Sequence, residues 1–295
     1  MKYTNKYNLP ESLAQAIKND PYRQEGHIST TGVIKSPRML QLERRHDSEI
    51  VIDVSERVFP LIGNNTHYII ERTKIKNALQ EERFSCKILG WTVTSQIDDY
   101  SPPDTLSDYK VTSMWAVKAG VKSEWEDQLN IQSYLLRLAG FPVEKAQIIA
   151  IMRDWSKPRS KREQNYPEVQ VEVLPVKLWD LNTQQNWLHQ RVELHQYAEK
   201  LPDDKLLLCT YDEMWEKPTT YAVKKEGNKR ATKVLTTEKD AENVKLVCEE
   251  RHPKDKWIIE VRPGERTRCE HYCPVSQFCN QYKSYKEETN VNNSK

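Results

Sequence analysis

Two aspartates and a lysine near the middle of the chain are the first residues that could do chemistry together. Asp98 ends a run rich in β-branched and aromatic residues, and Asp108 and Lys110 lie in the next such run. Asp108 and Lys110 are two residues apart, so their side chains share one face of a strand. If the two runs pair as a hairpin, the carboxylates of Asp98 and Asp108 meet, and Mg²⁺ or Mn²⁺ would relieve their repulsion. This pattern favours phosphodiester cleavage, in which a water activated by the cation attacks phosphorus and Lys110 balances charge on the phosphate.

A helix predicted before these strands carries His67 and Glu71, four residues apart and therefore on one face. Gly63 and the polar residues 64–66 predict where this helix begins. A lone histidine is more often a core or capping residue, and an Asp-x-Lys pair in a strand is more often exposed to solvent. Gln128, on a later helix, could equally lie on a polar face. The ordered set nevertheless favours one shared site, in which Glu71 either binds the metal or braces the helix.

The elements predicted around these residues alternate between helices and strands. Such an order favours an α/β fold with a central mixed sheet flanked by helices. The last third of the chain is expected to be irregular, and residues 286–295 to form a frayed tail. The predicted helices cover residues 63–79, 123–140 and 183–200, and the predicted strands cover 87–98, 105–117, 145–155 and 169–179.

Composition restricts the class of protein. The chain has 295 residues, a mean hydropathy of −0.81 and a formal net charge of +2. No run approaches the roughly 20 apolar residues of a membrane span, and the first residues lack a signal peptide's apolar centre. We therefore expect a cytoplasmic protein. Because the net charge is close to zero, any surface that binds nucleic acid must be local.

Three of the six cysteines lie close together near the C-terminus, as Cys269, Cys273 and Cys279, spaced C-x3-C-x5-C. In an intracellular chain such spacing suggests a metal site more than a disulfide framework. Thiolates bind Zn²⁺ or an iron–sulfur cluster, and four ligands complete either site. The alternative is that all six are free thiols.

Two basic stretches could contact the phosphates of DNA, although basic loops are most often only solvated. Trp155 or Tyr166, beside the first stretch, could stack on unpaired bases. DNA held in this way would be bound by its backbone, with little sequence preference. The first stretch contains Lys157, Arg159, Lys161 and Arg162, with Arg153 and Trp155 just before it as further predicted DNA contacts, and the second contains Lys224, Lys225, Lys229, Arg230 and Lys233.

Four segments together resemble the RecB-like branch of the PD-(D/E)XK nuclease superfamily: GNNTHYIIE, TSQIDDY, LSDYKVTS and WEDQLNIQSYLL. The resemblance implies a restriction-endonuclease-like core and metal-dependent cleavage of DNA. It implies that His67, Asp98, Asp108 and the Tyr109 carbonyl bind the metal. Lys110 would then be the catalytic lysine, and Gln128 would position water or DNA. The family's glutamine motif usually has tyrosine four residues on, where this chain has Gln132, with Tyr134 two residues further.

The cysteines are similar to those of the iron–sulfur nucleases of CRISPR spacer acquisition. Those relatives space three C-terminal cysteines C-x2-C-x5-C, one residue shorter in the first gap, and take a fourth from a segment before the His/Glu helix. Here that segment holds Ser36 and no cysteine. Cys209, at the start of a predicted loop, is the expected substitute, whereas Cys86 and Cys248 are expected to pack in the interior. The resemblance implies a [4Fe–4S] cluster, with Zn²⁺ as the alternative.

The resemblance implies a phage-type exonuclease that acts on DNA ends or single strands in recombination, repair or replication. The expected domains are an N-terminal extension (1–62), a nuclease core (63–200), a cysteine-rich region (201–285) and the tail. No G-x-x-x-x-G-K-[ST] motif occurs, so unwinding would need a helicase or recombinase partner. Two rival hypotheses remain: a catalytically inactive nuclease fold that binds DNA or protein, and a zinc-stabilised DNA-binding factor.

Overall fold

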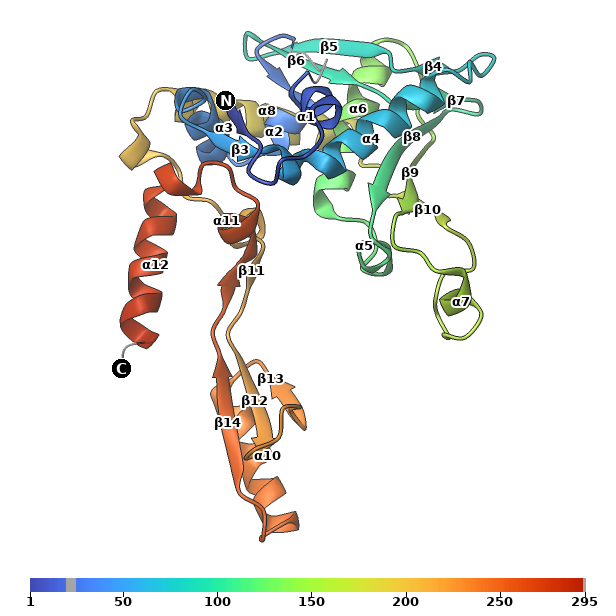
Figure 1. The fold of residues 1–295 in the computed structure, drawn as a ribbon. Coiled ribbons are helices and arrows are strands. Elements are labelled where there is room, and N and C mark those ends of the chain that lie inside the picture. The colour runs from blue at the N-terminus through green and yellow to red at the C-terminus, as the bar shows by residue number, and fades with distance from the viewer. Residues whose placement is uncertain (20–24, 294–295) are drawn as a thin grey trace. The chain divides into compact units, whose positions relative to one another are not determined.

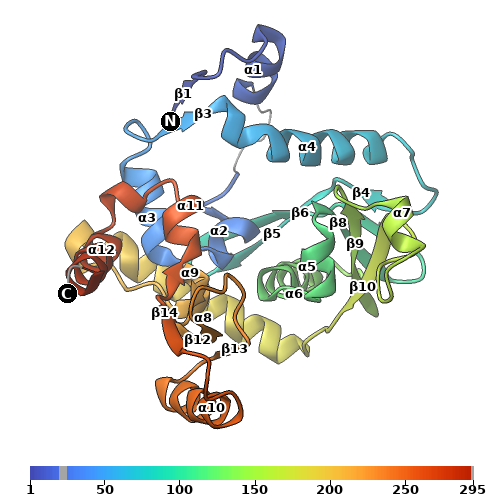
Figure 2. The same ribbon diagram turned by 60° about the horizontal axis from the view of Figure 1, so that its bottom comes forward.

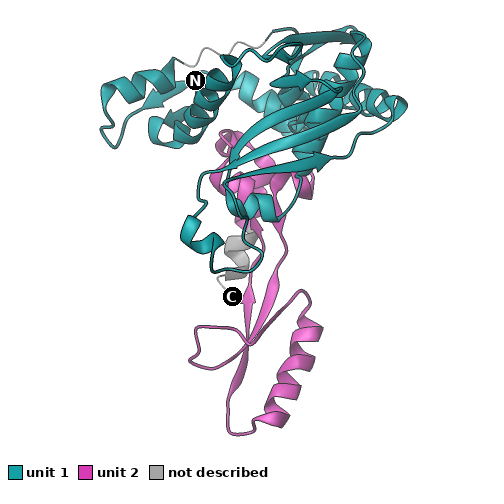
Figure 3. Cartoon of the chain, turned by 90° about the vertical axis from the view of Figure 1, so that its right-hand side faces the viewer, with its two compact units in different colours: residues 1–207 teal, residues 208–295 magenta. Residues whose placement is uncertain are grey.

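The computed structural model describes residues 1–19 and 25–293, with side chains described as far as Glu287. The chain divides into two compact units, Met1–Leu207 and Leu208–Lys295 (Figure 3). The boundary thus falls after Leu207, where the sequence suggested residue 200. Residues 1–62 form no unit of their own but belong to unit 1. No helix among the described residues is long and apolar enough to cross a membrane.

A five-stranded mixed sheet is the centre of unit 1 and confirms the predicted α/β class. β8 and β9 run parallel, and the other neighbours are antiparallel. The parallel pair requires a crossover, which helix α6 supplies. The strand predicted over 105–117 ends at Thr112, because Ser113 caps a short helix, α5 (Met114–Lys118), by accepting a hydrogen bond from the Ala116 N–H. The order of the sheet is β10 (Val171–Val176), β9 (Lys145–Met152), β8 (Thr105–Thr112), β7 (Asp99–Ser101) and β4 (Leu79–Gln80).

The strand predicted over 87–98 is wrong as a single element. It is split between β5 (Arg83–Ile88) and β6 (Trp91–Gln96), which form a hairpin. Leu89 and Gly90 make the turn, both with positive φ (49° and 82°), as a two-residue hairpin requires. β2 (Ile28–Ser29) completes this three-stranded sheet beside β6. The short strand β7, rather than β6, pairs with β8, so the predicted hairpin exists with a much shorter first strand.

Two long helices, α6 (Ser123–Leu138) and α8 (Leu181–Glu199), confirm the helices predicted there (Figure 2). One core lies between α6 and the five-stranded sheet and includes Leu106, Leu129 and Ile148. A second core joins α6 and α8 to the β5–β6 hairpin, α2 (Thr30–Ile34) and α3 (Pro37–Arg45). Residues expected to be an extension therefore complete the interior of unit 1.

Helix α4 (Val58–Glu71) lies beside β8 (Figure 1) and begins five residues before the predicted start at Gly63. Its first turn contains Pro60, which is tolerated there because the first N–H groups of a helix have no partner within it. Gly63 and residues 64–66 are therefore inside the helix rather than at its cap. The rest of unit 1 consists of β1 (Lys2–Thr4), α1 (Glu11–Lys18), β3 (Val51–Asp53), η1 (Val54–Arg57), α7 (Lys157–Ser160) and η2 (Asp203–Lys205).

Unit 2 is more regular than the sequence suggested. Its three-stranded sheet packs on α10 around Val223, Ala241 and Trp257. A two-stranded pairing of β11 with β15 leads from this sheet to a group of short helices. The elements are α9 (Tyr211–Met214), β11 (Glu216–Lys217), β12 (Thr220–Lys225), β13 (Lys233–Leu235), α10 (Glu238–Arg251), β14 (Trp257–Arg262), β15 (Glu265–Arg266), α11 (Thr267–His271), η3 (Ser276–Phe278) and α12 (Asn280–Asn293).

Candidate active site

A pocket of about 680 Å³ in unit 1 gathers the residues that the sequence singled out. α4, α6, β8 and the β5–β6 hairpin supply most of its walls. Residues from distant parts of the sequence thus face one cavity. The predicted catalytic residues that line it are His67, Glu71, Asp98, Asp108, Lys110 and Gln128.

Asp108, Lys110 and Gln128 form a closed set of hydrogen bonds. Lys110 Nζ lies 2.7 Å from Asp108 Oδ2 and 2.9 Å from Oδ1. Gln128 Nε2 donates to Asp108 Oδ1 at 2.7 Å, and Gln128 Oε1 accepts from Lys110 Nζ at 3.2 Å. The two-residue spacing on β8 places the acid and the lysine side by side, and α6 brings the glutamine to them. Gln128 therefore lies in the site rather than on an exposed polar face.

Lys110 is held in its charged form. Burial alone would lower the pKa of its ammonium group, but the carboxylates of Asp108 and Asp98 outweigh burial and raise the pKa above the ordinary value. Its side chain is one quarter exposed, whereas that of Asp108 is 1% exposed. The lysine thus keeps a positive charge in the pocket, where it can meet an anionic substrate.

Asp98 lies in the short break between β6 and β7, directly before the first residue of β7. Its Oδ2 accepts a hydrogen bond of 2.8 Å from the backbone N–H of Tyr109. Burial, and then the charge of Asp108, raise the pKa of Asp98 to about 7. The predicted crowding of two carboxylates is therefore present, although β7 rather than β6 is the strand that brings them together.

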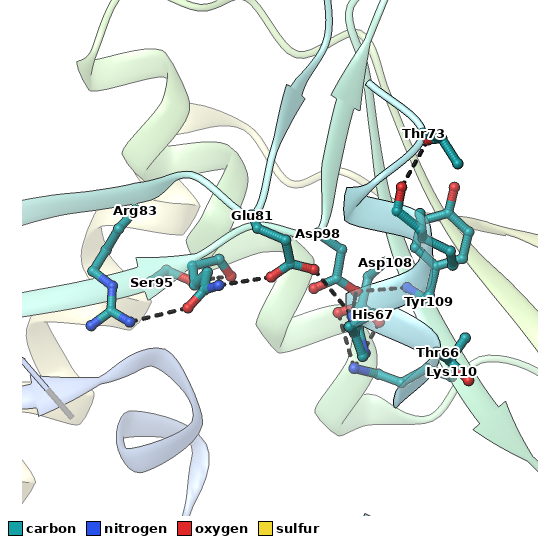
Figure 4. A network of polar contacts seen from close by, with 12 residues as sticks. Thr66, His67, Thr73, Glu81, Arg83, Ser95, Asp98, Asp108, Tyr109 and Lys110 are labelled. Carbon is teal, nitrogen blue, oxygen red and sulfur yellow. Dashed lines mark hydrogen bonds and ion pairs between the residues drawn. The ribbon is translucent and has the colours of Figure 1, made fainter. Parts of the chain in front are cut away.

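His67 faces this acid from α4. Its Nδ1 lies 3.5 Å from Asp98 Oδ2 and 3.4 Å from Oε1 of Glu81 (Figure 4). The contact with Glu81, reinforced by the charge of Asp98, raises the pKa of the imidazole against the opposing effect of burial. One nitrogen of His67 and one oxygen each of Glu81 and Asp98 lie within 4.8 Å of one another, so these three residues could hold a metal ion.

Glu81 is the functional candidate that the sequence did not reveal. It lies in the bend between β4 and β5, next to Glu82. Nothing in the local sequence distinguishes these two glutamates. Only the fold decides that the side chain of Glu81 lines the pocket while Glu82 is exposed.

Two of the other predicted residues are placed less clearly. Glu71, the last residue of α4, lines the pocket but is exposed and lies outside the group of His67, Glu81 and Asp98. The metal-binding role expected for the Tyr109 carbonyl stays a prediction. Gln132 lines the pocket and donates to the Gln96 carbonyl at 3.0 Å, whereas Tyr134 is buried in the second core.

The first basic stretch connects β9 to β10, and none of its predicted DNA-binding residues lines the pocket. Trp155 is partly buried, with its ring packed against the core and its Nε1 donating to the Pro167 carbonyl at 2.9 Å, and its stacking on bases stays a prediction. Tyr166 is buried. Arg159 is bound to Glu163 through two contacts of 2.6 and 2.9 Å. The exposed cations are Arg153, which lies over the ring of Phe59, and Lys157, Lys161 and Arg162.

In unit 2 the structure brings together the four cysteines expected as ligands. Cys209 precedes α9, Cys269 lies on α11, and Cys273 and Cys279 flank η3. Burial raises the pKa of the Cys269 thiol to about 12, and Cys273, Cys209 and Cys279 each lie near enough to Cys269 to raise it further. Gln281 holds Cys209 by accepting from its N–H at 2.8 Å and donating to its carbonyl at 3.0 Å.

The other two cysteines, Cys86 on β5 and Cys248 on α10, pack against separate cores. This separation matches the division that the sequence suggested between ligands and packing residues. No disulfide joins any of the six cysteines, all of which lie among the described residues.

No family model matches this chain, and no curated protein matches it. Among solved structures, the crystal structure of SSO0001 aligns with 62% of this chain and 85% of its own, at 16% sequence identity and a TM-score of 0.44.

Proposed function

We propose that the protein is a metal-dependent deoxyribonuclease that hydrolyses phosphodiester bonds at DNA ends or in single strands, as an exonuclease. The observation that carries the proposal is the pocket in which Asp98 and Asp108 meet His67, Lys110 and Gln128. These are the residue types that a phosphodiester-cleaving centre needs, in the order along the chain that resembles the RecB-like nucleases.

The residues fit a divalent cation. Asp108 is buried and the side chain of Asp98 is only 12% exposed. Burial, and then the charge of Asp108, make ionisation of Asp98 unfavourable and raise its pKa to about 7. A divalent cation would remove the repulsion between the two carboxylates. Carboxylate oxygens suit both Mn²⁺ and Mg²⁺, and an imidazole nitrogen suits Mn²⁺ better than Mg²⁺. His67, Asp98, Asp108 and the Tyr109 carbonyl would hold it. When bound, the metal would polarise the phosphate and lower the pKa of a water molecule.

The chain's own residues have distinct tasks in this proposal. Lys110 keeps its charge and stabilises the negative charge that develops on the phosphate. Gln128 contacts both Asp108 and Lys110, so it keeps the acid and the lysine at a constant separation. The hydrogen bond from the Tyr109 N–H keeps the Asp98 carboxylate in the pocket that Asp108 and Lys110 also line. Each of these contacts exists before substrate binds.

The cysteine group of unit 2 is proposed to bind a [4Fe–4S] cluster, or Zn²⁺ in its place, through Cys209, Cys269, Cys273 and Cys279. The proximity of the four thiols supports a bound metal centre. Its role in this proposal is structural rather than catalytic. Bound thiolates would join Cys209 to the three cysteines near the C-terminus and so stabilise unit 2.

DNA is the proposed partner, bound by its backbone. Lys157, Lys161 and Arg162 are the proposed contacts, because they are exposed and no ion pair occupies them within the described part of the β9–β10 connection. A helicase or recombinase would supply unwound DNA. The proposed setting is the cytoplasm, of the host cell if a phage encodes the chain.

The test is a gel assay with end-labelled single- and double-stranded DNA in Mn²⁺, Mg²⁺ or EDTA. We expect wild type to release label only with metal, and Lys110→Ala to bind DNA without cutting it. The end that loses label first gives the polarity. Protein that binds DNA but cuts none of these substrates, with its cysteine site filled, would instead support an inactive nuclease fold.

A further inference from the structure

The backbone at Glu81 is held in a conformation that side chains disfavour. Its φ is +55°, in the left-handed region where glycine is the usual residue. The Glu81 N–H donates to the Asp98 carbonyl at 3.3 Å, which ties this bend to the residue that carries the first acid. A residue kept in an unfavourable conformation beside a pocket suggests a function for its side chain.

The two oxygens of the Glu81 carboxylate have different partners. Oε2 accepts a hydrogen bond of 2.7 Å from Gln96 Nε2. Oε1 lies 3.4 Å from Nδ1 of His67, and the side chain is only 16% exposed. One oxygen is thus anchored to the β5–β6 hairpin, and the other is directed toward His67 and Asp98.

Gln96 is itself oriented by Arg83. The Arg83 Nη2 donates to Gln96 Oε1 at 3.0 Å. A guanidinium group only donates hydrogen bonds, so Gln96 must turn its oxygen to Arg83 and its NH₂ group to Glu81. The Gln96 carbonyl also accepts from Gln132, which fixes the same residue from α6. This network keeps the position of Glu81 well defined.

We infer that Glu81 is a further side-chain ligand of the divalent cation, beside His67 and Asp98, and that Gln96 positions it. This inference rests on the proposed function, since it concerns the same cation. Carboxylates that bind metals are commonly hydrogen-bonded by a second residue in this way. The alternative is that Glu81 only pairs with His67 and has no role in metal binding.

The experiment is calorimetric titration of Mn²⁺ into the full-length, EDTA-treated protein. Glu81→Gln keeps the size of the side chain and removes the charge, and we expect it to raise the Kd for Mn²⁺ at least tenfold. Glu82→Gln, the matched control on the exposed neighbour, should change the Kd less than twofold. Glu81→Gly suits the positive φ, so it should fold in any case, and it should weaken Mn²⁺ binding as much as Glu81→Gln.

Gln96→Leu separates positioning from a merely structural effect. We expect a rise in the Kd for Mn²⁺ of about tenfold with kcat restored at saturating Mn²⁺, because the ligand remains but is held less firmly. Loss of kcat that excess Mn²⁺ does not restore would argue against a positioning role.

The outcomes also distinguish this inference from the proposed function. If wild type binds Mn²⁺ and Asp98→Asn does not, while Glu81→Gln binds like wild type, Glu81 is no ligand and the nuclease proposal stands. If wild type itself binds no Mn²⁺ or Mg²⁺, both fail.

Discussion

The backbone N–H of Tyr109 donates a hydrogen bond of 2.8 Å to the carboxylate of Asp98. Tyr109 lies between Asp108 and Lys110, so the strand that carries the second acid also holds the first. A backbone donor cannot be removed by substituting the Tyr109 side chain. The orientation of Asp98 therefore depends on the alignment of β8 itself.

Asp98→Asn should stabilise the protein in EDTA. Asparagine can still accept from the Tyr109 N–H, but it removes a charge that partial burial and the carboxylate of Asp108 both disfavour. A gain of about 1 kcal/mol corresponds to a rise in Tm of roughly 2–4 °C for a protein of this size. Mn²⁺ should raise the Tm of wild type and leave that of the variant unchanged. A lower Tm for the variant in EDTA would contradict the repulsion.

Gln128→Ala should lower kcat at saturating Mn²⁺ by roughly 10–100-fold, the usual cost of losing a residue that orients the reacting groups. Gln128 contacts Asp108 and Lys110, whereas Gln132, one turn later, contacts the Gln96 carbonyl. Gln132→Ala is therefore the matched control and should affect kcat less. An equal or larger loss of kcat in Gln132→Ala would show that Gln128 is not the glutamine that orients the reacting groups.

The basic residues of the β9–β10 connection should contribute unequally to DNA affinity. Replacing Lys157, Lys161 and Arg162 by glutamine should reduce the salt dependence of binding by about 2–3 units of slope, close to one unit for each phosphate that is no longer neutralised. Arg159→Gln should change the slope less, because Glu163 already neutralises Arg159. Fluorescence anisotropy in EDTA over a range of salt concentrations measures both. Equal slopes in wild type and the triple variant would exclude this surface.

Cys279→Ser should abolish the metal content of unit 2, because it removes one of four neighbouring thiols. Cys248 lies on α10 and packs against a separate core, so Cys248→Ser is the control and should keep the metal. Elemental analysis of the purified protein, with an assay for acid-labile sulfide, separates iron–sulfur from zinc. Equal metal content in both variants would show that Cys279 is not a ligand.

Stability should fall in mild acid because of His195. This side chain is fully buried, its Nε2 contacts the Val33 carbonyl at 3.0 Å, and burial lowers its pKa from 6.5 to about 4. As the pH falls below 6.5 the unfolded chain binds a proton and the folded protein does not, until the pH reaches about 4. The contribution of His195 to the free energy of unfolding should therefore drop by roughly 2 kcal/mol between about pH 6.5 and 5, at about 1.4 kcal/mol per pH unit. Asp98, with its pKa raised to about 7, contributes in the opposite direction over this range.

Urea unfolding at about pH 7 and about pH 5 measures this loss. His195→Gln removes the titrating group but can still donate to the Val33 carbonyl. From about pH 7 to about pH 5 the stability of the variant relative to wild type should therefore increase by roughly 2 kcal/mol. If the stability of wild type and variant depends on pH in the same way, groups other than His195 cause that dependence.

Much of the fold could be predicted because its elements have strong local signals. The apolar run at 148–152, rich in isoleucine, predicts β9, and Gly140 predicts the end of the helix before it. The errors arose where tertiary packing overrides local preference. Leu89 takes a positive φ to close the β5–β6 hairpin, which divides the strand predicted over 87–98.

The sequence by itself determined the parts of the site that depend on short spacing. Asp108 and Lys110 share a face because side-chain directions in a strand repeat every two residues. Gln128 lies on a helix that the local sequence predicts without any tertiary contact. Only the tertiary structure decided which other residues lie in the pocket with Asp108, Lys110 and Gln128. Glu81 and Glu82 have the same chemistry, and the bend after β4 alone turns one of them toward His67 while the other faces solvent. Such convergence depends on how strands pair over long distances, which no local pattern of residues encodes.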